Sequence, residues 1–357
     1  MAKPLPGLRL LRSLARLVAA TTPKPRKPAR KGRAKTAAKT AAQLELRKPT
    51  RPAPQTAPGK WLAQYTYSQG QRMAYWLYLP DRPTGEATTP GLPLLVMLHG
   101  CQQSATEFAQ GTRMNWLAEQ KGFAVLYPQQ ALRTQAHRCW RWYEPAVQRG
   151  EAETAMLANL VRSICEQYPI DRRRIYACGL SAGAGMAAVL AINHPELIAA
   201  VAMHSGPIFG AGHGSGGALR VMHHGDGVQA TAAIRHLLQR RSADGMPAMP
   251  ALLIQGSDDR VVRPVNQQQL VHQWLLLNGM EGAQPTRVDS KPAVRNGSRH
   301  AHLIQDYATG RKVILRVAHI EGLGHAWSGG DPTLRFNAKP GPDASRMVLD
   351  FLAKHRR

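Results

Sequence analysis

Hydrophobic positions along the chain follow two alternating patterns. Short, β-prone apolar runs are followed by longer segments whose apolar residues return every three or four positions, as between Glu151 and Tyr168. That spacing is typical of an amphipathic helix. The run from Pro93 to Gly100 is apolar almost throughout, as expected of a strand buried on both faces. Strands and helices that alternate many times predict an α/β fold, with a mostly parallel central sheet and helices on both faces.

The expected elements run from about residue 59 to the end of the chain. An antiparallel pair comes first, at 61–68 and 73–80, and further strands are expected at 93–100, 123–128, 175–181, 199–203, 251–255 and 313–320. Helices are expected around Trp116 and at 151–168, 182–194, 232–240, 265–277 and 344–354. The run 219–222 reads as a short, poor strand. Ligands of such sheets gather at the carboxyl ends of the strands, so candidate chemistry is sought there.

A serine framed by glycines lies between one of these strands and the next helix. In Gly179-Leu180-Ser181-Ala182-Gly183, the glycines indicate a turn so tight that side chains there would collide with the neighbouring strand and helix. Ser181 is therefore a candidate nucleophile, exposed at the tip of the turn and at the positive end of the following helix. The alternative is that Ser181 is an ordinary helix N-cap.

A catalytic serine needs a base to take its proton and a carboxylate to hold that base in the right tautomer. In this kind of fold the order along the chain is serine, acid, histidine. Asp259 is the preferred acid because it follows the predicted strand 251–255 through a glycine turn. Asp258 and Asp226 are the alternatives, and the aspartates that are not used are expected in loops or helix caps.

His325 is the preferred base among the 14 histidines. It lies beyond the last predicted strand, in a glycine-flanked loop that would carry the imidazole toward Ser181. His300, His302 and His319 are expected to be structural or exposed. The first two fall in a hairpin-like stretch before the last strand, and His319 falls inside that strand.

Two backbone amides are expected to stabilise the oxyanion of such a reaction. Ala182, just after the nucleophile, would supply one amide, and Cys101, in the loop after an apolar strand, would supply the other. A disulfide between Cys101 and Cys139 is a further possibility. The sequence leaves open whether that bridge, or one between Cys165 and Cys178, forms.

The net charge of +25 is concentrated near the N-terminus. Residues 1–60 contain 16 Lys and Arg against the single Glu45, a net charge of +15, which leaves +10 for the other 297 residues. Residues 1–58 are rich in Lys, Arg, Pro and Ala, so we expect a largely disordered tail with a short amphipathic helix near 7–20, followed by a folded domain at 59–357. The tail is a solvated segment, an anchor to an anionic surface or granule, or a nucleic-acid-binding arm, and its lack of aromatics disfavours the last.

Hydropathy near the N-terminus bears on location. No run of about 18 apolar residues occurs anywhere, so no transmembrane helix is expected. Arg9, Arg12 and Arg16 interrupt the apolar stretch near the N-terminus, which makes it a poor secretory signal peptide. This pattern favours a cytoplasmic location or export by an unconventional route.

Several motifs together resemble the esterase family named after polyhydroxybutyrate depolymerases, which is also similar to feruloyl and acetylxylan esterases. The resemblance extends from about Gly59 to the C-terminus. The motifs that carry it are Leu98-His99-Gly100-Cys101-Gln102-Gln103, Cys139-Trp140-Arg141-Trp142-Tyr143, Gly179-Leu180-Ser181-Ala182-Gly183, Met203-His204-Ser205-Gly206, Gly324-His325-Ala326-Trp327-Ser328-Gly329-Gly330 and Gly341-Pro342-Asp343-Ala344-Ser345.

The resemblance implies an α/β-hydrolase that cleaves esters of hydroxy or aromatic acids through an acyl-enzyme at Ser181. Asp259 and His325 would complete the triad, and no metal or organic cofactor would be needed. An extracellular location is what the family suggests, in contrast to the N-terminal pattern. The leading hypothesis is hydrolysis of poly- or oligo-(3-hydroxybutyrate)-type esters.

Four side chains are candidates for substrate contact under this resemblance: Gln102, Trp140, Trp142 and Trp327. A tryptophan is equally often plain core. One alternative function is a feruloyl- or acetylxylan-type esterase that acts on polysaccharide-linked esters. An alternative of another class is a polyanion- or granule-binding protein that works through residues 1–58.

Overall fold

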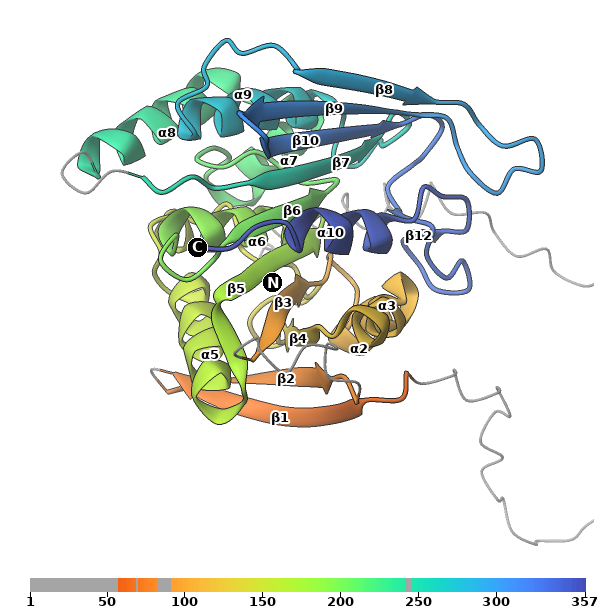
Figure 1. Cartoon of the computed structure of the whole chain (residues 1–357). Helices are drawn as coiled ribbons and strands as arrows, with labels where there is room; N and C mark the ends of the chain where they lie inside the picture. Colours follow the sequence, from red (N-terminus) through yellow and green to blue (C-terminus); the bar gives the residue numbers. More distant parts are fainter. Residues whose placement is uncertain (1–56, 69, 82–90, 242–245) are drawn as a thin grey trace, which may run out of the picture.

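The computed structural model, which describes residues 57–68, 70–81, 91–241 and 246–357, contains one central sheet of ten strands (Figure 1). In chain order its strands are β1 (Lys60–Ser68), β2 (Gln71–Leu79), β3 (Leu92–Leu98), β4 (Ala124–Gln129), β5 (Ile170–Leu180), β6 (Ala200–His204), β7 (Ala251–Gly256), β8 (Arg287–Lys291), β9 (His302–Thr309) and β10 (Lys312–Ile320). Two short strands, β11 (Trp327–Ser328) and β12 (Asn337–Ala338), pair with each other in parallel.

The strand order across the sheet is β1-β2-β4-β3-β5-β6-β7-β10-β9-β8. The middle strands from β4 to β10 pair in parallel. The strands β1 and β2 at one edge, and β9 and β8 at the other, pair antiparallel. Because the middle strands run in one direction, the loops that follow β3, β5, β6, β7 and β10 meet at the same side of the sheet.

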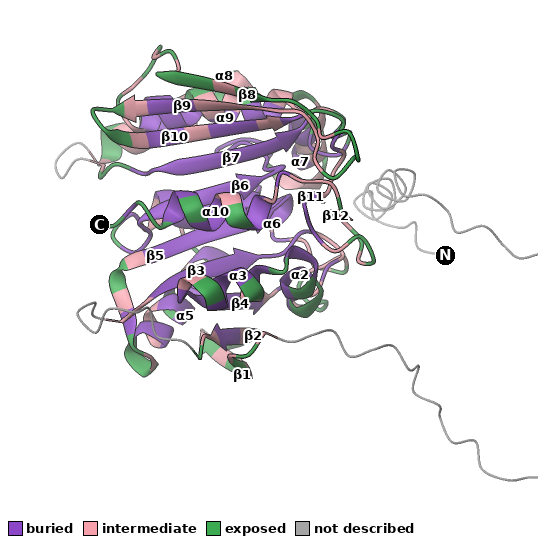
Figure 2. Cartoon of the chain, turned by 45° about the vertical axis from the view of Figure 1, so that its right-hand side comes forward, coloured by how far each residue is buried: buried purple, intermediate pink, exposed green. Residues whose placement is uncertain are grey.

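Helices cover both faces of this sheet. The described helices are α2 (Ala105–Thr112), α3 (Met114–Lys121), α4 (Pro145–Gln148), α5 (Glu153–Gln167), α6 (Ala182–Asn193), α7 (Gly214–His224), α8 (Gly227–Arg240), α9 (Val265–Leu277) and α10 (Ala344–Leu352). Helices α2, α3 and α10 pack on one face, and α4 to α9 pack on the other, so that the sheet separates two hydrophobic clusters. Figure 2 shows β3, β6 and β7 buried along almost their whole length, with exposed residues on the outer sides of helices such as α10 and on the edge strand β8.

Most of the predicted elements are confirmed, and the α/β fold class with them. The expectation of a short strand at 219–222 is wrong, because these residues belong to α7. Ala218, Val221 and Met222 are buried there, and their spacing of three and four places them on one face of a helix. The edge strand β8 was not predicted, since its residues are mostly exposed and leave no hydrophobic alternation.

The predicted amphipathic helix at 7–20, and all but the last two residues of the predicted disordered tail, lie outside the described residues. Residues 57 and 58 lie just before β1, which begins at Lys60. None of the described helices is long and apolar enough to cross a membrane.

Candidate active site

Ser181 lies in the sharp turn between β5 and α6, with φ 58° and ψ −122°. Few residues other than glycine adopt such a conformation, which costs about 1–3 kcal/mol and persists only where the surrounding structure imposes it. Ser181 occupies the N-cap position of α6, but its side chain makes no capping hydrogen bond. Its hydroxyl is therefore not used to stabilise the helix and remains available at the positive end of α6.

Gly179 and Gly183 make this turn possible because the chain passes close to itself on both sides of the serine. A Cβ atom on Gly179 would collide with the backbone carbonyl of Gly183, and a Cβ atom on Gly183 would collide with the carbonyl oxygen of Leu98 at the end of β3. Neither glycine has a positive φ. Glycine is needed at these two positions because it lacks a side chain, and not because the backbone adopts a left-handed conformation there.

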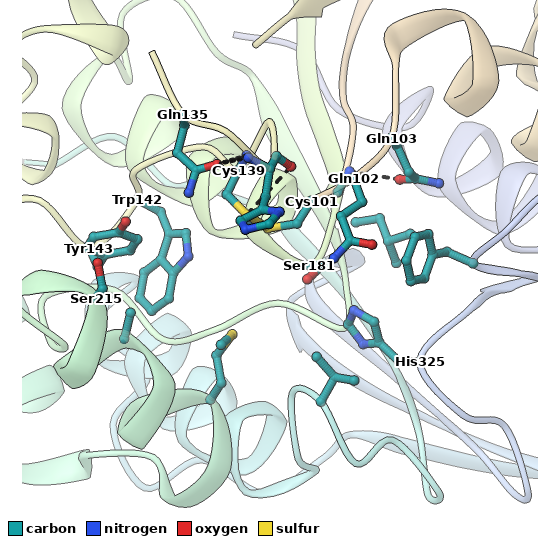
Figure 3. Close-up of a pocket in the computed structure, with 18 residues that line it drawn as sticks. Cys101, Gln102, Gln103, Gln135, Cys139, Trp142, Tyr143, Ser181, Ser215 and His325 are labelled. Carbon is teal, nitrogen blue, oxygen red and sulfur yellow. Dashed lines mark hydrogen bonds between the residues drawn. A yellow bond between two sulfur atoms is a disulfide. The ribbon is translucent and has the colours of Figure 1, made fainter. Parts of the chain in front are cut away.

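A cavity of about 780 Å³, counting the space open to solvent at its mouth, contains Ser181 and His325 (Figure 3). Figure 3 shows these two side chains directed into it together, with Trp142, Tyr143 and Ser215 toward its other end. None of the described residues that line it is Asp, Glu, Lys or Arg. They are Gly100, Cys101, Gln102, Gln103, Gln135, His137, Cys139, Trp142, Tyr143, Leu180, Ser181, Ala182, Ser215, Ala218, Met222, Val261, His325 and Phe336.

Asp259 and His325 are brought together from the loops that follow β7 and β10. His325 Nδ1 lies 2.8 Å from Asp259 Oδ2, and 6% of the His325 side chain and none of the Asp259 side chain is exposed. The amides of Val261 and Val262 donate to Asp259 Oδ1 at 3.0 and 2.9 Å. Gln255 Nε2 donates to Oδ2 at 3.1 Å, so both carboxylate oxygens have donors.

These contacts keep Asp259 ionised despite its burial. Burial by itself raises the pKa of the carboxyl. The charge of His325 and hydrogen bonds from His325, Ser205 and Val262 outweigh that effect and hold the pKa of Asp259 below its usual 3.8. An ionised Asp259 keeps the proton of a neutral His325 on Nδ1, which leaves Nε2 without a proton. This is the tautomer that can accept a proton from a serine hydroxyl.

The alternative acids lie in other surroundings. Asp258 is exposed and accepts a hydrogen bond from Ser257 Oγ at 2.8 Å. Asp226 caps α8, where its side chain accepts from the Gln229 amide at 3.2 Å. Neither side chain contacts His325 in the part of the chain that the structure describes.

The three other histidines weighed as bases are each half-buried, and none of them lines the cavity. His319 lies within β10, with Nδ1 3.4 Å from Gln267 Oε1. His302 begins β9, and His300 lies in the loop before it.

The peptide between Gly100 and Cys101 is held from its carbonyl side. The Gln130 amide donates to His99 Nε2 at 3.1 Å, so the proton of this ring is on Nδ1, which donates to the Gly100 oxygen at 2.8 Å. The Gln103 amide donates to the same oxygen at 3.3 Å. Burial lowers the pKa of His99 to about 4, so the ring stays neutral. A trans peptide points its N–H away from its carbonyl, which directs the Cys101 amide away from these donors.

Two amides next to Ser181 lack partners that would compete with an oxyanion. Among the described residues, the Cys101 amide finds no hydrogen-bond acceptor. Ala182 is the first residue of α6, and the first N–H groups of a helix have no acceptor within it. Both residues border the cavity. The geometry therefore permits the oxyanion-binding role predicted for this pair.

Cys101 also forms a disulfide with Cys139, and the bridge contributes to the cavity wall. The two uses are compatible, because the disulfide engages the side chain and an oxyanion would engage the backbone amide. Cys165 and Cys178 are free and buried. The bridge between them that the sequence left open is therefore absent.

The four side chains expected at the substrate divide into two groups. Gln102 and Trp142 line the cavity, whereas Trp140 and Trp327 do not. Trp140 is 0% and Trp327 is 1% exposed, and each packs against a buried histidine at the carboxyl end of β3 or β6. The expectation that Trp140 and Trp327 contact substrate is wrong. They support the loops that carry the site, and no local pattern separates them from Trp142.

A chain of hydrogen bonds that the sequence did not indicate leads from Ser328 through His204 and Ser205 to Asp259. The Ser328 amide donates to His204 Nε2 at 3.3 Å, so the other ring nitrogen carries the proton and donates to Ser205 Oγ at 3.1 Å. The Ser205 hydroxyl then donates its own proton to Asp259, which is one cause of the lowered pKa of that carboxyl. Burial lowers the pKa of His204 to about 3, so His204 remains neutral.

The lining residues that the sequence did not single out include Gln135, Tyr143, Ser215 and Phe336. Gln135 comes from an irregular loop, where its Oε1 accepts the amides of residues 137 and 139 at 2.6 and 3.2 Å. Of these residues, only Tyr143 belongs to a motif that carries the family resemblance. Gln135 and Phe336 are placed by loop conformation, for which no periodic pattern exists, and Ser215 lies in the first turn of α7.

The sheet order, the strained serine turn and the Asp–His pair at the carboxyl side of the strands define the α/β-hydrolase class. The solved structure of an acetyl xylan esterase from Aspergillus awamori shares this fold, with a TM-score of 0.64, 19% identity, and coverage of 83% of this chain and 100% of that chain. A family model described as "Esterase PHB depolymerase" matches residues 73–296. The chain belongs to this family of esterases. The match ends before His325, so the position of that histidine rests on the structure.

Curated relatives come from two groups of esterases. The chain is 30% identical over 237 residues to poly(3-hydroxyalkanoate) depolymerase C of Paucimonas lemoignei, which covers 65% of this chain and 54% of that protein. It is 29% identical over 216 residues to feruloyl esterase B of Thermothelomyces thermophilus, which covers 58% of this chain and 72% of that protein. The chain thus spans about half the length of the depolymerase that it matches. Ester hydrolysis is what the names of these relatives have in common.

We expect Gly183→Ala to lower the free energy of unfolding by about 1–3 kcal/mol and to reduce turnover of a p-nitrophenyl ester severely. The reason is that the new Cβ would collide with the Leu98 carbonyl oxygen and displace Ser181. Urea denaturation and initial rates measure the two effects. Gly227→Ala is the control, because its Cβ would only reach Gln269 at 3.4 Å or more. Equal behaviour of the two variants would contradict the steric account.

We expect Ser205→Gly and Ser205→Ala each to lower kcat by about tenfold, with a smaller change in KM, because Asp259 loses a donor. Loss of this donor should raise the pKa of Asp259, which the hydrogen bond from Ser205 helps to hold down, so activity should be lost at a higher pH on the acid side of the rate profile. Ser205 has φ 51°, a conformation that suits glycine. If the residue served only the backbone, the glycine variant would keep the wild-type rate and pH profile.

Proposed function

We propose that this protein is a serine carboxylic-ester hydrolase with Ser181, Asp259 and His325 as its catalytic triad. The observation that supports this best is the 2.8 Å contact between the buried Asp259 and His325, beside a cavity that also contains Ser181 on its strained turn. A histidine oriented by an ionised carboxylate is the base that a serine hydroxyl needs near neutral pH.

In the first half of the reaction, His325 Nε2 takes the proton of Ser181 as Oγ attacks the ester carbonyl carbon. The amides of Cys101 and Ala182 bind the oxyanion of the tetrahedral intermediate. The bond to the alcohol oxygen then breaks, and the alcohol leaves with the proton from His325. In the second half, His325 deprotonates a water that attacks the acyl-Ser181 carbonyl, and the acid is released as Ser181 regains its proton.

For the substrate, we propose short 3-hydroxyalkanoate esters of the poly- or oligo-(3-hydroxybutyrate) type. The cavity wall lacks charged side chains and combines apolar groups such as Trp142, Met222 and Val261 with amide groups such as that of Gln135. Such a wall suits a chain of neutral ester groups separated by short hydrocarbon units. The family match and the depolymerase relative favour the same class.

A feruloyl- or acetylxylan-type esterase is the second candidate. Its support is the relative named feruloyl esterase B and the aromatic pair Trp142 and Tyr143, whose rings meet edge to face with centroids 5.5 Å apart at one end of the cavity. A flat aromatic acyl group could pack against these rings. Relative rates on a 3-hydroxybutyrate trimer, a methyl ferulate and an acetylated xylo-oligomer distinguish the two candidates.

We expect Ser181→Ala and His325→Ala to lower kcat by about 10³-fold or more, and Asp259→Asn by about 10³-fold, on p-nitrophenyl butyrate and on the 3-hydroxybutyrate trimer. Asp258→Asn and His300→Ala make the matched changes outside the cavity and should keep near-wild-type rates. A Ser181→Ala variant with its rate intact would refute the triad. A wild type inactive on every ester would leave polyanion binding through the basic residues 1–58 as the surviving hypothesis.

We further propose that residues 59–357 form the esterase domain and that it works outside the cytoplasm. The Cys101–Cys139 disulfide supports this location, because such bridges persist in oxidising compartments. We expect alkylation and mass spectrometry of the active protein to find free thiols at Cys165 and Cys178 and a bridge between the other two cysteines. Four free thiols in fully active protein isolated from its natural location would argue for a reducing compartment.

A further inference from the structure

Arg335 lies at the rim of the cavity, where two lining residues hold it. Its Nη2 donates to Gln102 Oε1 at 3.1 Å, and its Cζ lies 5.0 Å from the centre of the Phe336 ring. Gln102 and Phe336 line the cavity together with Ser181 and His325. The Phe336 ring also meets the His325 ring edge to face, with 6.4 Å between centroids. The exposed guanidinium is therefore separated from the candidate base by a single aromatic side chain.

No acidic side chain neutralises this cation in the part of the chain that the structure describes. The nearby Asp331 uses its Oδ1 to accept the amide and hydroxyl of Thr333 at 2.9 and 2.8 Å. Arg141 and Arg316, by contrast, are neutralised by carboxylates. An oriented, unpaired guanidinium beside an otherwise uncharged cavity is suited to a carboxylate of the bound molecule.

The backbone around Arg335 has unusual conformations of the kind found at functional sites. Gln102 has φ 63° and Phe336 has φ 62°, and with Ser181 they make three of the seven described non-glycine residues with positive φ. All three line this cavity. Such conformations are costly and cluster at functional sites. Here the two outer ones carry the side chains that hold Arg335.

We propose that Arg335 binds the terminal carboxylate of an ester oligomer, so that the enzyme prefers soluble chains with a free carboxyl end and releases hydroxy acid from that end. The inference rests on the proposed ester hydrolase function and specifies its substrate. A polymer interior has no carboxylate and gains nothing from this arginine.

The reaction places the carboxylate at the rim. When Ser181 Oγ bonds to the carbonyl carbon of the last ester, the bond to the alcohol oxygen breaks, and that oxygen takes the proton from His325. The leaving group is a free hydroxy acid, whose carboxylate is one hydroxy acid unit away from the carbonyl under attack. A cation just outside the lining of the cavity, against Gln102 and Phe336, suits that distance. Arg335 offers two parallel N–H groups for such a carboxylate.

The test compares kcat/KM for the 3-hydroxybutyrate trimer acid and its methyl ester. At low salt we expect the wild type to prefer the acid by about five- to tenfold and the preference to weaken as NaCl screens the charge. The ratio should approach one in Arg335→Gln and be intermediate in Arg335→Lys, which keeps the charge but not the planar fork. Arg311→Gln, in the turn between β9 and β10, is the control and should keep the wild-type ratio.

A second measurement does not require the trimer to be a substrate. In this assay, hydrolysis of p-nitrophenyl butyrate is followed while either 3-hydroxybutyrate or the neutral 3-hydroxybutyramide is added as a competing ligand. We expect the anion to inhibit the wild type more strongly than the amide, and this difference to vanish in Arg335→Gln. Equal inhibition by both, or an unchanged ratio in Arg335→Gln, overturns the role of Arg335 while ester hydrolysis stands. Failure of the wild type to cleave any ester overturns the proposed function and this inference with it.

Discussion

The ionised carboxylate of Asp259, buried away from water, is the constraint on which the site depends. A charge in such a place is strongly unfavourable unless donors satisfy its oxygens. Its donors come from separate parts of the chain, since Val261 and Val262 lie in its own loop, Gln255 lies on β7 and His325 follows β10. The parallel pairing of β7 with β10 brings these groups together. The register of β7 against β10 and the orientation of His325 thus both serve to bring donors to the buried carboxylate of Asp259.

Local sequence patterns predicted the parts of the protein that are determined locally. The periodicity of apolar residues located most strands and helices, because burial on one face of an element depends on spacing along that element. The turn at Ser181 could be predicted from its own glycines. Gly179 avoids a collision within the turn, whereas Gly183 avoids one with the carbonyl of Leu98 at the end of β3. The pairing of Asp259 with His325 followed from their order after successive strands, although their catalytic role still awaits experiment.

Most other contacts between distant segments could not be predicted, because they leave no spacing in the sequence. Trp140 and Trp142 are two residues apart, yet one is core and the other lines the cavity. The hydrogen bond of Ser205 to Asp259 depends on how the ends of β6 and β7 approach each other. The disulfide of Cys101 likewise depends on a loop conformation that only the folded chain defines.

The order of strands across the sheet also determines when the site exists during folding. Strand β10 lies beside β7 in the sheet but follows β8 and β9 in the chain, and the loop that carries His325 follows β10. A nascent or truncated chain that ends before this loop contains Ser181 but no base for it. Because long-range parallel pairing is slow compared with local structure formation, the return of turnover during refolding marks the docking of the C-terminal segment. If the proposed triad is correct, Ser181 has no base until that late step.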